Sequence, residues 1–172
     1  METTLYKKEG DTIYFWHVKT QELDSEQDYW VSTKWGTPGK FKGGNFRCFD
    51  SKWQSDNYYN ELLSEHVQSY DYKPTLQRVK LGINIEEAKM KMSEDDFETY
   101  IFDFTQHLEE HLSETGNGTF DDSYKEWGVI DNTYWAYLLV INKELALKNL
   151  KRYFVKLTPR ESIFFEEEII VQ

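Results

Sequence analysis

The sequence predicts an α+β protein made of two small modules, residues 1–74 and residues 75–172. Stretches rich in aromatic and β-branched residues alternate with stretches whose apolar residues recur at helical spacing. Hydrophobic residues make up 39% of the chain and aromatic residues 17%, which excludes a disordered chain. The large aromatic side chains supply much of the apolar area that a core needs. Pro74 disfavours helix at the residue before it, and the charge balance changes just beyond it, which places the boundary there.

Three stretches of the first module predict strands, at residues 11–20, 27–35 and 43–50, because each is β-rich and is bounded by polar or glycine-containing segments. Their order indicates an antiparallel meander. A helix is expected over residues 51–70, with Asp50 or Ser51 as its N-cap. Its apolar residues at helical spacing are Trp53, Tyr58, Leu62, Leu63 and Val67.

The second module begins with a predicted strand at residues 76–85, followed by a helix at residues 93–114. Ser93 is its expected cap, and the acidic first turn suits the helix dipole. The expected buried stripe consists of Phe97, Ile101, Phe104, Leu108 and Leu112.

A glycine-containing break at residues 116–122 ends that helix, and a short strand is expected within residues 123–130. Residues 133–141 predict a central strand, residues 143–157 a second helix, and residues 162–172 the last strand. The second helix is expected to point Leu147, Leu150, Phe154 and Leu157 inward. The order strand, helix, strand, strand, helix, strand is that of a ferredoxin-like split βαβ module.

The formal net charge of −11 is unevenly distributed, with −3 on residues 1–74 and −8 on residues 75–172. A negative field disfavours non-specific binding to phosphate backbones, and it favours either a basic partner or solubility alone. The opening residues contain charges before any apolar run, and no stretch is apolar enough to cross a membrane. We therefore expect a cytoplasmic protein with no membrane partner.

Clusters of acidic residues mark the candidate protein-binding positions, namely Asp95, Asp96, Asp121, Asp122, Glu166, Glu167 and Glu168. The three consecutive glutamates lie in a predicted strand, where they place charge on both faces, so we expect an edge strand. Two interpretations stay open for them. They protect the edge from strand-to-strand aggregation, or they present an acidic edge to a basic partner.

The most enzyme-like motif pairs His107 with His111, four residues apart on one helix face, where two histidines can bind zinc. The alternative is that both lie on the solvated flank of an amphipathic helix. Cys48 is the only cysteine, which excludes an internal disulfide framework and any multi-cysteine zinc site. No nucleophile, base and orienting group can be assembled, so we expect neither an enzyme nor a cofactor or metal.

The sequence from Tyr29 to Lys40, YWVSTKWGTPGK, is aromatic and basic within an acidic chain. With the strands around it, this stretch resembles the WGR domain family over roughly residues 3–72, with Trp35 and Gly36 at the first two positions of the Trp-Gly-Arg triplet. Thr37 stands in place of the arginine, and threonine supplies neither its charge nor its bidentate fork. The resemblance implies a sheet-plus-helix module that grips nucleic-acid ends, with Trp35, Lys34, Lys40, Lys42 and Arg47 as the candidate residues.

The layout of the second half is similar to ferredoxin-like modules of bacterial proteins, including toxin-immunity proteins. We therefore expect a non-catalytic acidic recognition protein that binds and neutralises a protein partner with a basic surface, such as a toxin or nuclease. The alternative function is a WGR-type accessory protein that binds nucleic-acid ends.

Overall fold

The computed structural model describes residues 1–23, 28–121, 128–153 and 163–171. The chain divides into two compact units, one of residues 1–74 with 113–116, and one of residues 75–112 with 117–172. Each unit combines an antiparallel sheet with helices, which confirms the α+β fold class.

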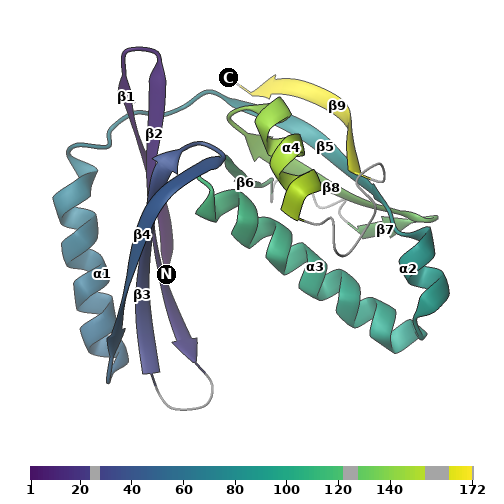
Figure 1. Cartoon of the computed structure of the whole chain (residues 1–172), viewed down its shortest axis with the longest axis horizontal. Helices are drawn as coiled ribbons and strands as arrows, with labels where there is room; N and C mark the ends of the chain where they lie inside the picture. Colours follow the sequence, from purple (N-terminus) through teal and green to yellow (C-terminus); the bar gives the residue numbers. More distant parts are fainter. Residues whose placement is uncertain (24–27, 122–127, 154–162, 172) are drawn as a thin grey trace. The chain divides into compact units, whose positions relative to one another are not determined.

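The first unit contains a four-stranded antiparallel meander in the order β1-β2-β3-β4 (Figure 1). Its strands are β1 (Glu2–Glu9), β2 (Thr12–Leu23), β3 (Asp28–Thr37) and β4 (Lys40–Phe49). The meander was predicted, but β1 was not predicted as a strand. Charged residues at its end interrupt the apolar alternation, and they are tolerated because β1 lies at the edge of the sheet.

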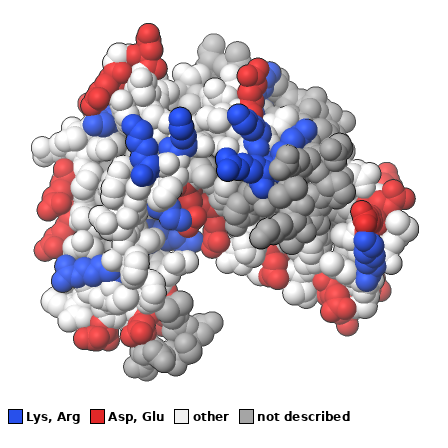
Figure 2. Space-filling model, viewed as in Figure 1, with Lys and Arg blue, Asp and Glu red and all other residues white. Residues whose placement is uncertain are grey.

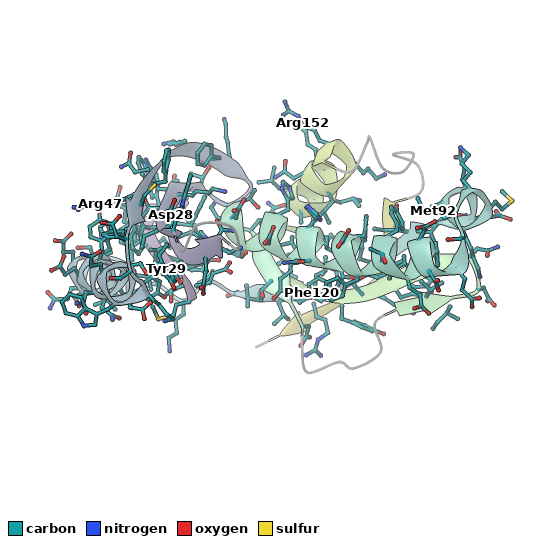
Figure 3. The ribbon with its side chains drawn as sticks, turned by 90° about the horizontal axis from the view of Figure 1, so that it is seen from below. Asp28, Tyr29, Arg47, Met92, Phe120 and Arg152 are labelled. Carbon is teal, nitrogen blue, oxygen red and sulfur yellow. The ribbon has the colours of Figure 1, made fainter. Side chains whose placement is uncertain are left out.

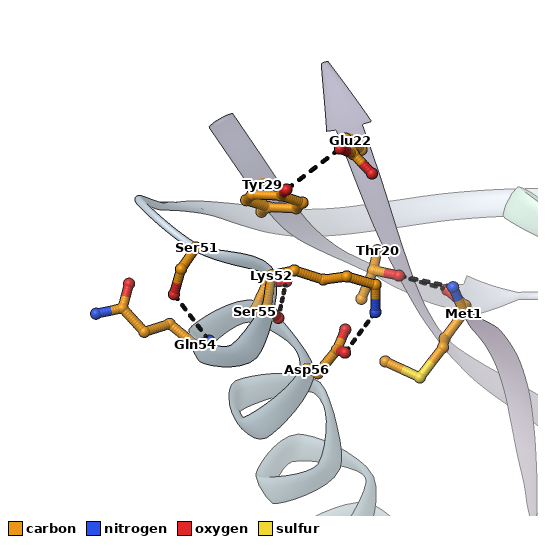
Figure 4. Close-up of polar contacts among 9 residues, drawn as sticks. All are labelled: Met1, Thr20, Glu22, Tyr29, Ser51, Lys52, Gln54, Ser55 and Asp56. Atoms are coloured by element: carbon orange, nitrogen blue, oxygen red, sulfur yellow. Dashed lines mark hydrogen bonds and ion pairs between the residues drawn. The ribbon is translucent and has the colours of Figure 1, made fainter. Parts of the chain in front are cut away.

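Helix α1 (Lys52–Val67) follows the sheet and packs on one of its faces. Ser51 is the N-cap, and its Oγ accepts a hydrogen bond of 3.4 Å from the backbone N of Gln54 (Figure 4). Lys52 also donates to Asp56 Oδ2, one turn on, over 2.5 Å. The buried cluster between helix and sheet contains Trp16, Val18, Val31 and Tyr59.

The stripe predicted for this helix is wrong at its first position, because Trp53 is 73% exposed. The buried residues of α1 are Ser55 and Tyr59. Two residues span about 200° of helix rotation, so Trp53 points away from the face that carries Ser55. Val67, at the end of the helix, is also exposed.

The second unit alternates strands and helices. The strand predicted within residues 123–130 corresponds to β7, whereas α2 was not predicted and β6 lies in residues 116–122, where a break was expected. The elements are β5 (Leu76–Asn84), α2 (Glu86–Lys91), α3 (Glu94–Glu114), β6 (Gly118–Phe120), β7 (Gly128–Ile130), β8 (Thr133–Val140), α4 (Lys143–Tyr153) and β9 (Ile163–Val171).

The sheet of this unit has the order β6-β8-β5-β9, with β7 also paired to β8. Because β5 and β6 are both antiparallel to β8, they are parallel to each other with β8 between them. By the same reasoning β8 and β9 are parallel with β5 between them. Two βαβ units are therefore split by each other's strand, which is the predicted arrangement, although β6 and not the strand expected within residues 123–130 supplies its second strand.

The core of the second unit lies between its sheet and helices α3 and α4. Phe104, Leu108 and Leu112 are buried as predicted, and Phe97 and Ile101 are half-buried against the same cluster. Residues of α3 and of α4 join one cluster, so both helices cover the same face of the sheet (Figure 1). Leu150 is buried and Leu147 packs against the cluster, whereas Phe154 and Leu157 lie outside the described residues.

Candidate protein-binding surface

The junction of α2 and α3 begins with a capped helix start. The backbone N of Asp96 donates to Ser93 Oγ over 3.3 Å, which confirms Ser93 as the cap. The Ser93 hydroxyl donates in turn to Asp96 Oδ2 over 2.6 Å. The Asp96 carboxylate thus faces the cap, and both Asp96 and Asp95 are exposed.

Acidic residues dominate this junction. Residues 86–103 contain seven aspartates and glutamates against two lysines. One of the lysines, Lys91, donates to Glu87 one turn before it, and this hydrogen bond lowers the pKa of Glu87. Figure 2 shows red side chains around blue ones at this end of the second unit. A negative surface therefore surrounds the start of α3.

An apolar groove of about 660 Å³ opens within this acidic surface. Its lining residues come from α2, from the turn after it, from α3 and from β7, and they are Lys89, Met92, Ser93, Glu94, Phe97, Glu98, Ile101, Phe102 and Val129. We call these nine residues the α2–α3 groove. Figure 3 labels Met92 at the turn where α2 meets α3. Five of the nine are apolar, so the groove offers apolar contact between charged rims.

Large apolar side chains of the α2–α3 groove face solvent. Phe102 is 66% exposed and Met92 is 40% exposed. Met90 on α2 and Ile130 on β7, next to Val129 of the lining, are also exposed. Exposed apolar side chains gathered in one groove mark an interaction surface more often than scattered ones do. The sequence contained one signal for it, since Phe102 stands outside the buried stripe of α3.

Asp121 does not belong to an exposed acidic patch, so this predicted position is wrong. It is only 5% exposed, and its Oδ2 accepts a hydrogen bond from Arg78 Nε. Its backbone N also donates to the carbonyl of Tyr137 over 2.9 Å. Asp121 directly follows β6, so the pairing of β6 with β8 carries it onto the sheet beside Arg78 of β5. Asp122 lies outside the described residues.

The glutamate run lies in β9, which is at the edge of the sheet as predicted. Glu167 pairs in register with Lys80, and Glu168 with Val79. The register shifts between Lys80 and Leu81, where Glu166 is the extra residue on the β9 side. The side chains of β9 lie outside the described part of the structure, so the two interpretations of these glutamates both stay open.

In the first unit, Trp35 lines a second groove, of about 370 Å³, between α1 and the sheet. We call it the aromatic groove, and its lining residues are Trp16, Thr33, Trp35, Asn45, Tyr58, Leu62, His66 and Tyr70. The rings of Trp16 and His66 are stacked, with centroids 4.1 Å apart. Gly43 pairs with Trp35, and a Cβ on Gly43 would lie 2.9 Å from the indole, so the ring position depends on this glycine.

The basic residues of the predicted nucleic-acid set are not gathered around Trp35. Lys34 is the next residue on β3, so it points to the opposite face of the sheet, where it pairs with Glu114 of the 113–116 segment. Arg47 stacks over Phe49 and Tyr58, with its guanidinium carbon 5.2 and 5.0 Å from the ring centroids.

The other two lysines of the set lie near the β3–β4 turn. Lys40 is exposed at the start of β4, and Lys42 Nζ is 5.4 Å from the ring centroid of Tyr14. On the face shown in Figure 2, Lys and Arg of the first unit do not form one continuous patch.

The histidine pair of α3 shows no metal arrangement in the described part of the chain. His107 Nδ1 donates to the carbonyl of Asp103 over 2.6 Å on an exposed part of the helix. Within residues 1–23, 28–121, 128–153 and 163–171, no group of three or more His, Cys, Asp and Glu side chains is placed to hold a metal ion. The helices described here include none that is long and apolar enough to span a membrane.

Comparison with known proteins returned no match. No protein-family model, no curated protein and no solved structure matches this chain. The resemblances to the WGR domain family and to immunity-type modules therefore stay predictions from the sequence.

Proposed function

We propose that this chain is a non-catalytic recognition protein that binds a basic partner protein through the surface around the α2–α3 groove, and that it neutralises this partner as an immunity or inhibitor protein does. The observation that carries the proposal is an apolar groove with exposed Phe102 and Met92 inside an acidic rim. The resemblance of the second half to immunity-type modules supports the inhibitory part.

The two kinds of side chain at this surface contribute to binding in different ways. Carboxylates such as Glu94 and Asp95 attract a basic surface over a distance and raise the association rate, which salt then lowers. Buried aromatic and apolar anchors contribute most of the affinity once water is excluded around them. A surface with both features combines fast association with slow dissociation.

The proposal is tested by identifying a partner and measuring its association kinetics. Tagged protein is cross-linked in the native cell, the captured protein is purified, and its association rate is followed by stopped flow at increasing salt. We expect the rate to fall with salt and to fall further in Glu94→Gln and Asp95→Asn. Glu65→Gln, which removes the same charge from an exposed position of α1, is the matched control.

The inhibitory part needs a separate measurement, namely the partner's own activity with and without this protein. A salt-independent association rate, or equal effects of Asp95→Asn and Glu65→Gln, contradicts binding through the acidic rim. A bound partner whose activity is unchanged contradicts neutralisation while leaving recognition intact.

The aromatic groove favours a second candidate function, binding of nucleic-acid ends. Lys7 Nζ lies 5.3 Å from the ring centroids of both Tyr14 and Tyr70, and Tyr70 lines the groove beside Trp35. An aromatic platform with cations at its margin is the composition that stacks bases and holds phosphates. The resemblance to the WGR domain family supports this candidate, and the Thr37 substitution weakens it.

A gel-shift series tests the second candidate. Single-stranded, nicked and blunt-ended DNA are titrated at low salt against the wild type, Trp35→Phe and Lys7→Ala. We expect both substitutions to weaken binding, whereas Lys34→Ala serves as a control because Lys34 lies on the opposite face of the sheet in an ion pair. No shift with any substrate would exclude this function.

A further inference from the structure

We infer that the occupant of the α2–α3 groove is an amphipathic basic helix of the partner, with its apolar side chains in the groove and its Lys or Arg side chains against the acidic rim. This inference rests on the proposed function and specifies the partner's chemistry. It concerns a surface wholly within the second unit.

The lining of the groove fits a helix better than an extended peptide. Apolar residues come from α3 at Phe97, Ile101 and Phe102, from the turn at Met92 and from β7 at Val129, so several elements contribute apolar contacts for protruding side chains. A helix fills such a groove with anchors spaced three and four residues apart. An added strand needs a sheet edge, and β7 spans only three residues where strands usually have about five or six.

The acidic side chains around the groove favour an occupant with positive charge. Glu94 and Glu98 both line the groove and stand one helical turn apart on α3, and both are exposed. Lys89 is the basic residue of the lining, and Asp95, next to Glu94 on α3, adds a further exposed carboxylate. Two cationic side chains one turn apart on a ligand helix therefore match this rim, whereas an acidic helix is repelled by it.

Methionine gives the groove an adaptable wall. Met92 lies in the lining, and Met90 is exposed on the adjoining α2. Unbranched thioether side chains change rotamer easily and accommodate apolar residues of different shapes. The groove therefore selects an apolar stripe flanked by positive charge rather than one particular side chain.

The test uses synthetic peptides and the full chain. A fluorescein-labelled helix of about 18 residues, or about five turns, has Leu at positions i, i+4, i+7 and i+11 and Lys or Ala elsewhere. One control peptide replaces Lys by Glu, and another replaces Leu by Ser. Fluorescence anisotropy measures the affinity of each peptide. We expect binding of the Leu/Lys peptide only, weakening as salt rises.

Variants of the chain locate the site. Phe102→Ala and Glu98→Gln are expected to weaken binding about tenfold, because Phe102 supplies an anchor contact and Glu98 a facing charge. Phe46→Ala is the matched apolar control, since Phe46 is 68% exposed on β4 of the first unit. Glu65→Gln is the matched charge control. Circular dichroism confirms that each variant is folded.

The outcomes separate this inference from the proposed function. Binding that Glu98→Gln weakens but Phe102→Ala leaves unchanged overturns the groove inference, while an acidic recognition surface stands. If none of the peptides binds, the inference is overturned. The effect of salt on the association rate of the captured partner then tests the proposed function independently. Sedimentation of the chain alone must show a monomer, since a dimer abolished by Phe102→Ala assigns the groove to a second copy and overturns the inference.

Discussion

Substitution of Gly116 measures how tightly the 113–116 segment packs against the rest of the first unit. The residue belongs to the 113–116 segment of that unit and has φ of 60°. A Cβ at this position would lie 2.1 Å from Cγ of Phe15, whose side chain is fully buried. Gly10 has the same φ of 60° in the β1–β2 turn, with nothing within 4 Å of its added Cβ. The two glycines therefore share a backbone conformation and differ in surroundings.

The expected losses of stability follow from this difference. An L-residue in the left-handed region costs about 1–2 kcal/mol, and we expect Gly10→Ala to lose that amount alone. Gly116→Ala carries the same backbone cost and adds overpacking against Phe15, which costs about 1–3 kcal/mol. The free energy of unfolding should thus fall by about 2–5 kcal/mol in Gly116→Ala.

Urea unfolding followed by tryptophan fluorescence measures both losses. Four of the six tryptophans, Trp16, Trp30, Trp35 and Trp53, lie in the first unit, so the signal reports mainly on it. The steric reasoning fails if Gly116→Ala and Gly10→Ala differ by less than about 0.5 kcal/mol, because neighbouring atoms would then have no measurable effect.

Three further predictions concern buried polar groups. Burial lowers the pKa of His17, so the folded state binds a proton at this imidazole less readily than the unfolded state does. The free energy of unfolding, measured against pH, should therefore fall below about pH 6.5. His17→Gln should make this dependence on pH weaker. Asp121→Asn should lower the free energy of unfolding by about 1–3 kcal/mol, because it removes the charge of a buried carboxylate that accepts from Arg78, and an unchanged urea midpoint would contradict the pair. Burial raises the pKa of Tyr134 to about 12, so the free energy of unfolding should decline as pH rises above 10. Tyr134→Phe should remove this decline, and it should also cost about 1 kcal/mol because the 2.9 Å hydrogen bond to Thr105 is lost.

The order and type of most elements were readable from the sequence, because the signals behind them are local. The apolar stripe of α3 and its Ser93 cap depend on residues a few positions apart, and both are present in the structure. Strands β5, β8 and β9 follow from β-rich stretches, whereas β6 lies in a glycine-containing stretch that predicted a break, and only its pairing with β8 shows that it completes the split order. Strand β1 was not predicted, because its charged residues interrupt the alternation of apolar and polar residues. An edge strand tolerates such charges.

The candidate binding surface was decided by the tertiary structure. Asp95 was recognised as a surface charge, but nothing local shows that Val129 of β7 completes a groove with Met92 and Phe102, because pairing between β7 and β8 brings it there. The burial of Asp121 was likewise not predictable from local sequence. Its charge predicted an exposed position, whereas strand pairing brings it against Arg78. Composition and periodicity thus determined the modules and their charge, whereas packing between segments far apart in the chain determined which of those charges border an apolar surface and which are buried.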